Sequence, residues 1–516
     1  MLSFKIIVCF ALVEIARSKS KIEPYDKFPD DFKFGAATAG YQVEGGWNAN
    51  GKGESIWDVF THEHPDRILD GSNGDVAMDS YHLYEKAAAA LNYLGADVYR
   101  FSLSWTRLLP TGFVNQSNPD GIRYYNALID KLLAYGIEPV VTIYHWDTPE
   151  PLQRLGGFLS RDIIPYYLDY CQFAWEQFGD RVKTWITFNE INIISVAGYA
   201  RTTFAPGTGL AGHGEYLAAH HMLLSNAFAY RLYKKLPCTI GGGKIGIAHQ
   251  ALGYSLRSNS ARDIQANNLA QIFSTGWILH PIFTPAGDYP EEMKAIIGRN
   301  SLAQNYPRSR LPQFTPEEVE LVKGSADFLG INHYTSFVFT LPDDPITNAS
   351  YATQLDLSLF TCEDFPVLAY RKTEWFYLDY ELNSVAPDGF RDILTYISRN
   401  FGEPPIIITE FGFPYLSDGP NLNDLFRVDY YRQYLNAILQ ARRCGANVWG
   451  AICWSLIDTF EWYSGYTIQF GLYQVNQTSV DKLRTCRLSC EVIKEVIATK
   501  RIDFNSLPDY SNPVVF

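Results

Sequence analysis

The chain has 516 residues, of which 47% are hydrophobic and 19% are charged, so it can bury a large core and is not disordered. The net charge of -13 excludes unaided binding to nucleic acid or to an anionic membrane, because both require a positive surface. A neutral small molecule is therefore the expected partner. The length would allow several ordinary domains, but one large α/β barrel also fits.

The first 20 residues have the pattern of a cleaved signal peptide. Lys5 precedes the apolar run 6–13, and the small residues Ala16 and Ser18 follow it. No later run is long and apolar enough to span a bilayer. We therefore expect residues 1–20 to be removed and residues 21–516 to form a single secreted domain without a membrane span.

Three sequons and an odd number of cysteines are relevant to that compartment. Asn115, Asn348 and Asn476 are candidate N-glycosylation sites. Of eight cysteines, Cys9 leaves with the signal, so at least one of the remaining thiols is free or is joined to another chain.

Eight short apolar segments alternate with stretches of helical periodicity, and each segment ends in polar or aromatic residues. The segments are 32–38, 98–105, 139–147, 182–190, 244–250, 328–335, 405–410 and 448–458. Predicted helices between them include 77–94, 121–135, 164–178 and 428–443. Regular alternation implies parallel strands, and eight units predict a single (β/α)8 TIM barrel with elaborated βα loops. A doubly wound sheet is the alternative.

Two glutamates fall at the ends of predicted strands, where a barrel of this kind carries its active site. Cleavage of a glycoside with retention requires two carboxyl groups about 5 to 5.5 Å apart, one to attack and one to donate a proton. Glu190 and Glu410 would meet this requirement on one rim of the barrel. The alternative, two rim glutamates in structural ion pairs, is about equally compatible with the spacing alone.

The sequence around both glutamates resembles the β-glucosidase family of (β/α)8 glycoside hydrolases, which includes lactase, plant and insect β-glucosidases and myrosinases. The resemblance extends from about residue 28 to about residue 499. It is carried by Phe34-Gly-Ala-Ala-Thr-Ala-Gly-Tyr-Gln-Val-Glu-Gly45, Tyr99-Arg-Phe-Ser-Leu-Ser-Trp105, Tyr144-His-Trp-Asp147, Thr187-Phe-Asn-Glu190, Ile408-Thr-Glu-Phe-Gly412 and Trp454-Ser-Leu-Ile-Asp-Thr-Phe-Glu-Trp462.

This resemblance implies a retaining β-glycosidase in which Glu190 is the acid/base and Glu410 is the nucleophile. Arg100 and Tyr334 match the residues that hydrogen-bond the nucleophile and keep it ionised. The matching positions of the sugar pocket are Gln42, His145, Asn189, Tyr334, Trp454, Glu461 and Trp462. Asn189 matches the residue that contacts the sugar 2-hydroxyl. The carboxylate of Glu461 would repel a 6-phosphate, so we expect a non-phosphorylated sugar, most simply a β-glucoside.

Three positions depart from the family pattern. Ile191 replaces the proline that usually follows the acid/base, Phe411 replaces the asparagine after the nucleophile, and Thr459 replaces an asparagine near the sugar carboxylate. Phe411 is the departure closest to the chemistry. Its ring either fills space that an amide occupies elsewhere, or it has displaced a hydrogen bond that positions Glu410.

Two other functions remain open at this point. A thioglucosidase of the myrosinase type would use the same site, and the aglycone pocket, which we expect near Trp375, would decide between them. A non-catalytic, klotho-like binding protein would share the fold but would lack catalytic glutamates, so the presence of both Glu190 and Glu410 argues against it.

No cofactor or metal is expected. The run 241–246 fits a dinucleotide-binding glycine pattern, but it precedes a predicted strand and therefore indicates a turn. His62, His64 and the pair His220-His221 lack zinc-site spacing and are expected in a loop and on a helix, respectively.

Overall fold

The computed structural model describes residues 27–347, 349–351, 354–377, 383–417 and 421–516. The expected signal peptide and the sequon at Asn348 lie outside these residues. In the described part, no helix is long and apolar enough to cross a membrane.

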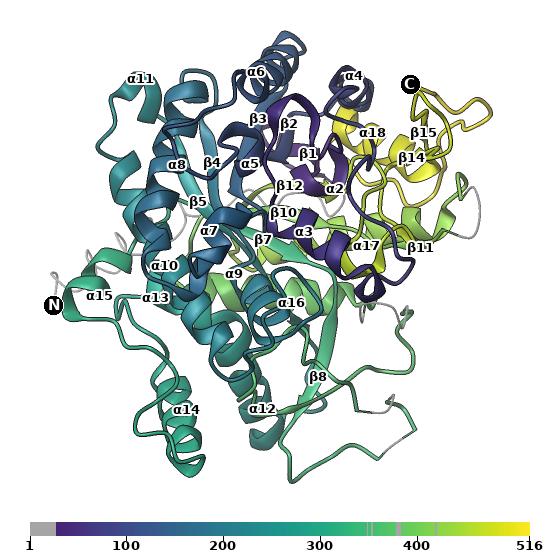
Figure 1. Ribbon diagram of the computed structural model, residues 1–516. Helices are drawn as coiled ribbons and strands as arrows, with labels where there is room; N and C mark the ends of the chain where they lie inside the picture. Colours follow the sequence, from purple (N-terminus) through teal and green to yellow (C-terminus); the bar gives the residue numbers. More distant parts are fainter. Residues whose placement is uncertain (1–26, 348, 352–353, 378–382, 418–420) are drawn as a thin grey trace, which may run out of the picture.

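Eight parallel strands close into a barrel in the order β1-β12-β10-β7-β5-β4-β3-β2 (Figure 1). Each of the eight segments expected to be a strand contributes one of them. The closed order confirms the barrel and rules out the doubly wound sheet. The strands are β1 Lys33–Ala37, β2 Val98–Ser102, β3 Glu138–Tyr144, β4 Thr184–Asn189, β5 Lys244–Gln250, β7 Leu329–His333, β10 Ile406–Phe411 and β12 Val448–Trp454.

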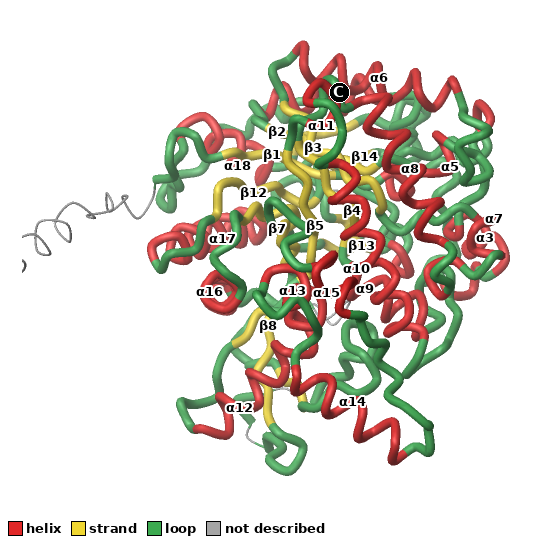
Figure 2. Tube along the Cα trace, turned by 90° about the vertical axis from the view of Figure 1, so that its left-hand side faces the viewer, coloured by secondary structure: helices red, strands yellow, loops and turns green. Residues whose placement is uncertain are grey.

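Helices surround the strands, which occupy the middle of the molecule (Figure 2). The longer helices are α3 Ile56–Glu63, α4 Tyr84–Leu94, α6 Pro119–Ala134, α8 Ile163–Phe178, α10 Gly214–Tyr233, α12 Ala261–Gln271, α13 Trp277–Phe283, α14 Glu291–Ala303, α15 Pro316–Val322, α16 Pro387–Asn400, α17 Leu425–Arg443 and α18 Leu488–Thr499. Short helical turns are α2 Gly40–Val43, α5 Trp105–Leu108, α7 Glu150–Arg154, α9 Ile191–Ile194 and α11 Cys238–Gly241.

The alternation of side chains along each strand produces two layers of core. On β4, Ile186 belongs to a cluster inside the barrel, together with Val98, Val140 and Ile407. Its neighbour Trp185 belongs to the larger cluster between the barrel and the helices. The interior is therefore a packed core, and the open space lies at the strand ends.

Short strands outside the barrel extend the loops at one end of it. β6 Gly253–Tyr254, β8 Ser336–Thr340 and β9 Leu368–Tyr370 form a three-stranded sheet. Both views place β8 at the lower end of the molecule, together with α12 and α14 (Figures 1 and 2). Two smaller pairs are β11 Tyr415–Leu416 with β13 Ile468–Gln469, and β14 Tyr473–Val475 with β15 Arg484–Cys486.

Some boundaries differ from the sequence prediction for identifiable reasons. The helix expected over 77–94 begins at Tyr84, because Ala77 and Asp79 have φ values of 43° and 48°, which a right-handed helix does not allow. The first of the histidines expected in a loop, His62, lies on α3 instead and contacts Asp75 at 2.8 Å. The side chains of the sequon residues Asn115 and Asn476 are exposed, as a glycan acceptor requires.

Candidate active site

The carboxyl ends of the barrel strands surround one pocket of about 750 Å³, open mouth included. All of the residues expected to bind the sugar line it directly, as do the two glutamates: Gln42, His145, Asn189, Glu190, Tyr334, Glu410, Trp454, Glu461 and Trp462. Arg100 lies behind this surface on β2 and is reached through Glu410. Trp375, expected near the aglycone, is not among the lining residues.

Glu410 is held by a cation and a phenol. The guanidinium of Arg100 forms a buried ion pair with one of its carboxylate oxygens. The hydroxyl of Tyr334 donates to the other oxygen at 2.6 Å. Both contacts are made to the ionised form of a carboxylate, so Glu410 is suited to act as an anion.

Glu190 lies in a contrasting environment. Burial, and after it the charge of Glu410, raise the pKa of its carboxyl to about 8, against the opposing effects of Asn332 and Arg100. The amide of Asn332 donates to its Oε1 at 2.6 Å. Glu190 also has a left-handed backbone, with φ of 47°, directly after β4. At neutral pH this carboxyl carries a proton, as a general acid must.

A chain of hydrogen bonds connects the two carboxyl groups. Arg100 donates to Oδ1 of Asn189 at 2.7 Å as well as to Glu410. Asn332 donates to the same Oδ1 at 3.0 Å as well as to Glu190. Asn189 therefore accepts from the partners of both glutamates and fixes their relative positions.

The sugar side of the pocket combines aromatic faces with polar atoms that lack protein partners. His145 stacks against Trp454 and Trp462, with ring centroids 6.2 and 5.9 Å apart. The Nδ1 atom of His145 and the Oε1 atom of Gln42 are buried and have no partner in the described structure. Because buried polar groups are normally paired, both atoms are suited to receive hydroxyl groups of a ligand.

Thr459 supports the carboxylate of Glu461. Its hydroxyl donates to Oε2 of Glu461 at 2.8 Å, and the amide of Gln42 donates to the same oxygen at 3.2 Å. The departure from asparagine at position 459 therefore still places a donor on this carboxylate.

The ring of Phe411 lies away from the pocket. It is fully buried and packs edge-on against Tyr431 of α17, with centroids 5.5 Å apart. It belongs to the core between barrel and helices, on the opposite face of β10 from Glu410. This position favours the first of the two interpretations, in which the ring fills space.

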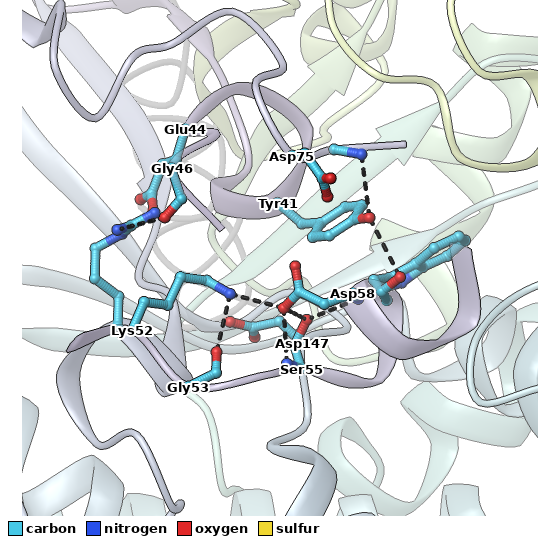
Figure 3. A network of polar contacts seen from close by, with 12 residues as sticks. Tyr41, Glu44, Gly46, Lys52, Gly53, Ser55, Asp58, Asp75 and Asp147 are labelled. Carbon is cyan, nitrogen blue, oxygen red and sulfur yellow. Dashed lines mark hydrogen bonds and ion pairs between the residues drawn. The ribbon is translucent and has the colours of Figure 1, made fainter. Parts of the chain in front are cut away.

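A second polar network includes Asp147, which lies just beyond the end of β3 (Figure 3). Asp147 accepts from the main-chain N–H of Trp105 at 2.8 Å, and Lys52 binds Asp58 at 2.7 Å. Burial raises the pKa of Asp147 to about 7. Asp147 follows His145 and Trp146, so the network anchors the turn that carries the histidine.

The wall of the pocket beyond Glu190 was missed by sequence reasoning. It contains the apolar side chains Ile193, Phe204, Leu359, Phe360 and Tyr463, and the amides Gln250 and Asn383. Gln250 is the last residue of a strand that the sequence did predict, so its place at the pocket end of the barrel could have been predicted. The others come from segments outside the barrel strands, where no periodicity marks a residue as pocket-lining.

Trp375, expected near the aglycone pocket, is not among the described residues that line this pocket, and its role stays a prediction. The indole lies with Lys372, whose ammonium group is 5.7 Å from the ring. In the described residues, no cluster of three His, Cys, Asp or Glu side chains is arranged to hold a metal ion.

Comparisons with known proteins agree with this geometry. Residues 24–502 match the family model "Glycosyl hydrolase family 1". Myrosinase 1 of Brevicoryne brassicae is 40% identical over 481 residues, which cover 92% of this chain and 99% of the relative. Beta-glucosidase 12 of Oryza sativa subsp. indica is 42% identical over 465 residues, which cover 86% of this chain and 88% of the relative.

Solved structures give the same result. An aphid myrosinase superposes with a TM-score of 0.85 at 40% identity, covering 92% of this chain and all of the other. The rice Os3BGlu6 beta-glucosidase superposes with a TM-score of 0.81 at 36% identity, covering 90% of this chain and 98% of the other. The chain therefore belongs to glycosyl hydrolase family 1, and it is a retaining β-glycosidase with the (β/α)8 fold.

Proposed function

We propose that the enzyme hydrolyses β-glucosides of small aglycones, with Glu410 as the nucleophile and Glu190 as the acid/base. The observation that carries this proposal is the pair of carboxyl groups in one pocket with opposite environments. Glu410 receives a cation and a phenol hydroxyl, while burial raises the pKa of Glu190 to about 8. Two carboxyls that differ in this way divide the roles of nucleophile and proton donor.

The reaction would proceed in two displacements. Glu410 attacks the anomeric carbon, the bond to the aglycone oxygen breaks, and that oxygen takes the proton of Glu190. Glu190, now a carboxylate, then removes a proton from water, and the resulting hydroxide displaces Glu410 from the same carbon. Asn332, which donates to Glu190, would stabilise the carboxylate between the two steps.

The decisive experiment is turnover of 4-nitrophenyl β-glucoside by the purified enzyme and by Glu410→Gln. We expect the variant to lose turnover by several orders of magnitude, because no covalent glycosyl-enzyme forms without the carboxylate. Glu138→Gln is the matched control, since Glu138 is exposed at the opposite end of β3 and its side chain pairs, among the described residues, with Lys33 alone, at 2.8 Å. Substantial activity in Glu410→Gln would remove this residue from its role.

The sugar is proposed to be unphosphorylated at position 6. The carboxylate of Glu461 lines the sugar pocket, where it can accept hydrogen bonds from hydroxyl groups but repels a phosphate. A comparison of 4-nitrophenyl β-glucoside with its 6-phosphate tests this, and preference for the phosphate would contradict the assignment.

A thioglucosidase is the second candidate, favoured by the 40% identity to an aphid myrosinase over nearly its whole length. A thiolate leaves with less help from a proton donor than an alkoxide does. Glu190→Ala would therefore spare a thioglucoside far more than an alkyl O-glucoside. Comparing kcat on the two substrates in the wild-type enzyme shows which one the site prefers.

Secretion and glycosylation are also proposed. The apolar run 6–13 and the exposed sequons at Asn115 and Asn476 support them. Expression of the full chain in insect cells, with N-terminal sequencing of the product in the medium, tests removal of residues 1–20. Enzymatic deglycosylation of wild type and Asn476→Gln tests the glycan, and retention of the protein inside the cell would contradict secretion.

A further inference from the structure

The side of the pocket that receives the leaving group is defined by Glu190. A general acid must reach the glycosidic oxygen, so the aglycone lies beyond this residue, away from the sugar contacts. The side chains there include Ile193, Phe204, Leu359 and Phe360. They present a mainly apolar wall, suited to a flat hydrophobic aglycone and not to a further sugar, whose many hydroxyl groups would lose their hydration there.

The charges of the pocket have one sign. Among its described lining residues, the carboxyl side chains are Glu190, Glu410 and Glu461, and no lysine or arginine is present. The nearest guanidinium, that of Arg100, is committed to Glu410 and Asn189. An anionic aglycone would find no free cation on the described lining to pair with, so it should bind less well than a neutral one.

Two amide side chains interrupt the apolar wall. Gln250 and Asn383 both line the pocket and are each only 3% exposed. The Oε1 atom of Gln250 and the Nδ2 atom of Asn383 have no hydrogen-bond partner in the described structure. Buried polar atoms in this state cost free energy unless a ligand or water satisfies them.

The positions of both amides are fixed by the end of β7. Gln250 is the last residue of β5, is paired with Asn332 of β7, and its carbonyl accepts from Asn192 at 3.1 Å. Asn383 precedes Ser384, whose hydroxyl is 2.9 Å from that of Thr335 and donates to the carbonyl of Ser336 at 3.1 Å. Asn332 also binds Glu190, so Gln250 lies beside the partner of the proposed acid, and Asn383 lines the same pocket.

We propose that Gln250 and Asn383 form a specificity site for a hydroxyl group on a neutral aromatic aglycone. A hydroxyl can donate to the acceptor of one amide and accept from the donor of the other, while the aromatic ring lies on the apolar wall. This inference rests on the proposed β-glucosidase function and names the aglycone class of that same site.

The first test compares three sets of substrates on the wild-type enzyme: hydroxyphenyl, methoxyphenyl and carboxyphenyl β-glucosides, each as ortho, meta and para isomers. Hydroxyl and methoxyl substituents leave the acidity of the departing phenol closely matched in the para pair, so kcat/KM reports binding of the substituent. We expect at least one hydroxyphenyl isomer to exceed its methoxyphenyl partner by roughly tenfold, the equivalent of ~1.4 kcal/mol of hydrogen bonding. The carboxyphenyl isomers are expected to be the poorest.

The second test measures the same ratio in Gln250→Met and Asn383→Leu, which keep size and remove the amide. Each substitution should bring the hydroxyphenyl to methoxyphenyl ratio toward one. Gln172→Met is the matched control, because Gln172 is exposed on α8 and bonds only to Glu176 in the described structure, and it should keep the wild-type ratio.

Three results would overturn the inference: equal rates for hydroxyl and methoxyl isomers in the wild type, a ratio unchanged in both variants, or efficient turnover of carboxyphenyl glucosides. All three leave the proposed function intact, provided that 4-nitrophenyl β-glucoside is hydrolysed. Failure of the function itself would appear instead as no turnover of any β-glucoside.

Discussion

Replacing Phe411 by asparagine, the residue typical of the family, should destabilise the protein without accelerating it. The ring is fully buried between β10 and α17. Loss of a phenyl ring from a core costs about 3–5 kcal/mol. An unpaired buried amide would add about 1–3 kcal/mol.

Two effects reduce this cost. The asparagine side chain refills part of the space, and its amide can pair with the hydroxyl of Tyr431, which is buried without a partner in the described structure. Such a bond returns about 1 kcal/mol. We therefore expect a net loss of about 3–5 kcal/mol in the free energy of unfolding, and a fall in Tm of roughly 5 °C for a chain of this size.

Thermal melts and urea unfolding, together with kcat on 4-nitrophenyl β-glucoside, measure both quantities. Phe411→Leu is the control, because it removes volume without adding a polar group and should lose less. The turnover number of Phe411→Asn should stay within about twofold of wild type, since the ring does not reach the pocket. An unchanged Tm with markedly faster turnover would refute the reasoning and show that the ring displaces a useful hydrogen bond.

Three further predictions concern other parts of the site. Glu190→Ala should lower kcat/KM on alkyl glucosides more than on dinitrophenyl glucosides, and equal losses of kcat/KM on both substrates would exclude the acid role. In the wild type, kcat/KM should fall as pH rises through about 8, where Glu190 loses its proton. Thr459→Val should lower kcat/KM on glucosides by roughly tenfold, mainly by raising KM, because it removes a charge-assisted hydrogen bond to Glu461. Thr459→Ser should restore kcat/KM, and a failure to restore it would show that the valine acts through packing. Burial raises the pKa of Asp147 to about 7 in the folded state, so the free energy of unfolding should decline as pH rises from about 4 through 7. Asp147→Asn should remove this decline, which amounts to at most about 4 kcal/mol. An equal change in the free energy of unfolding between pH 4 and pH 8 in the wild type and the variant would contradict the prediction.

The barrel strands were predictable because buried parallel strands leave a strong apolar signal that ends where polar residues begin. The prediction of Lys244–Gln250 coincides with β5, and the strand at Glu410 differs by one residue at each end. Helix boundaries were predicted wrongly where the backbone conformation of single residues could not be inferred from composition. Ala77 has a positive φ, so α4 begins at Tyr84 and not at residue 77.

The sugar side of the site was predictable because its residues stand inside motifs that are contiguous in sequence, at strand ends or shortly after them. The leaving-group side was not. Phe204 is more than a hundred residues from Leu359, and β9 lies between Leu359 and Asn383. Only the folded chain brings the three side chains to one pocket. Trp375 lies in a loop region where the resemblance to the family is weakest, so the sequence carried little information about which side chains of that loop face the pocket.

The pocket thus has two halves with different supports. The sugar half is built on the main-chain ladder of the barrel, where a shifted residue would disturb neighbouring strands on both sides. Much of the other half comes from connecting segments whose replacement leaves that ladder untouched. The two halves can therefore diverge at different rates, so a lineage can acquire new aglycones by exchanging loops while inheriting its sugar preference unchanged. For the same reason, the segment around Leu359 and Phe360 can be exchanged between relatives in order to change the aglycone preference.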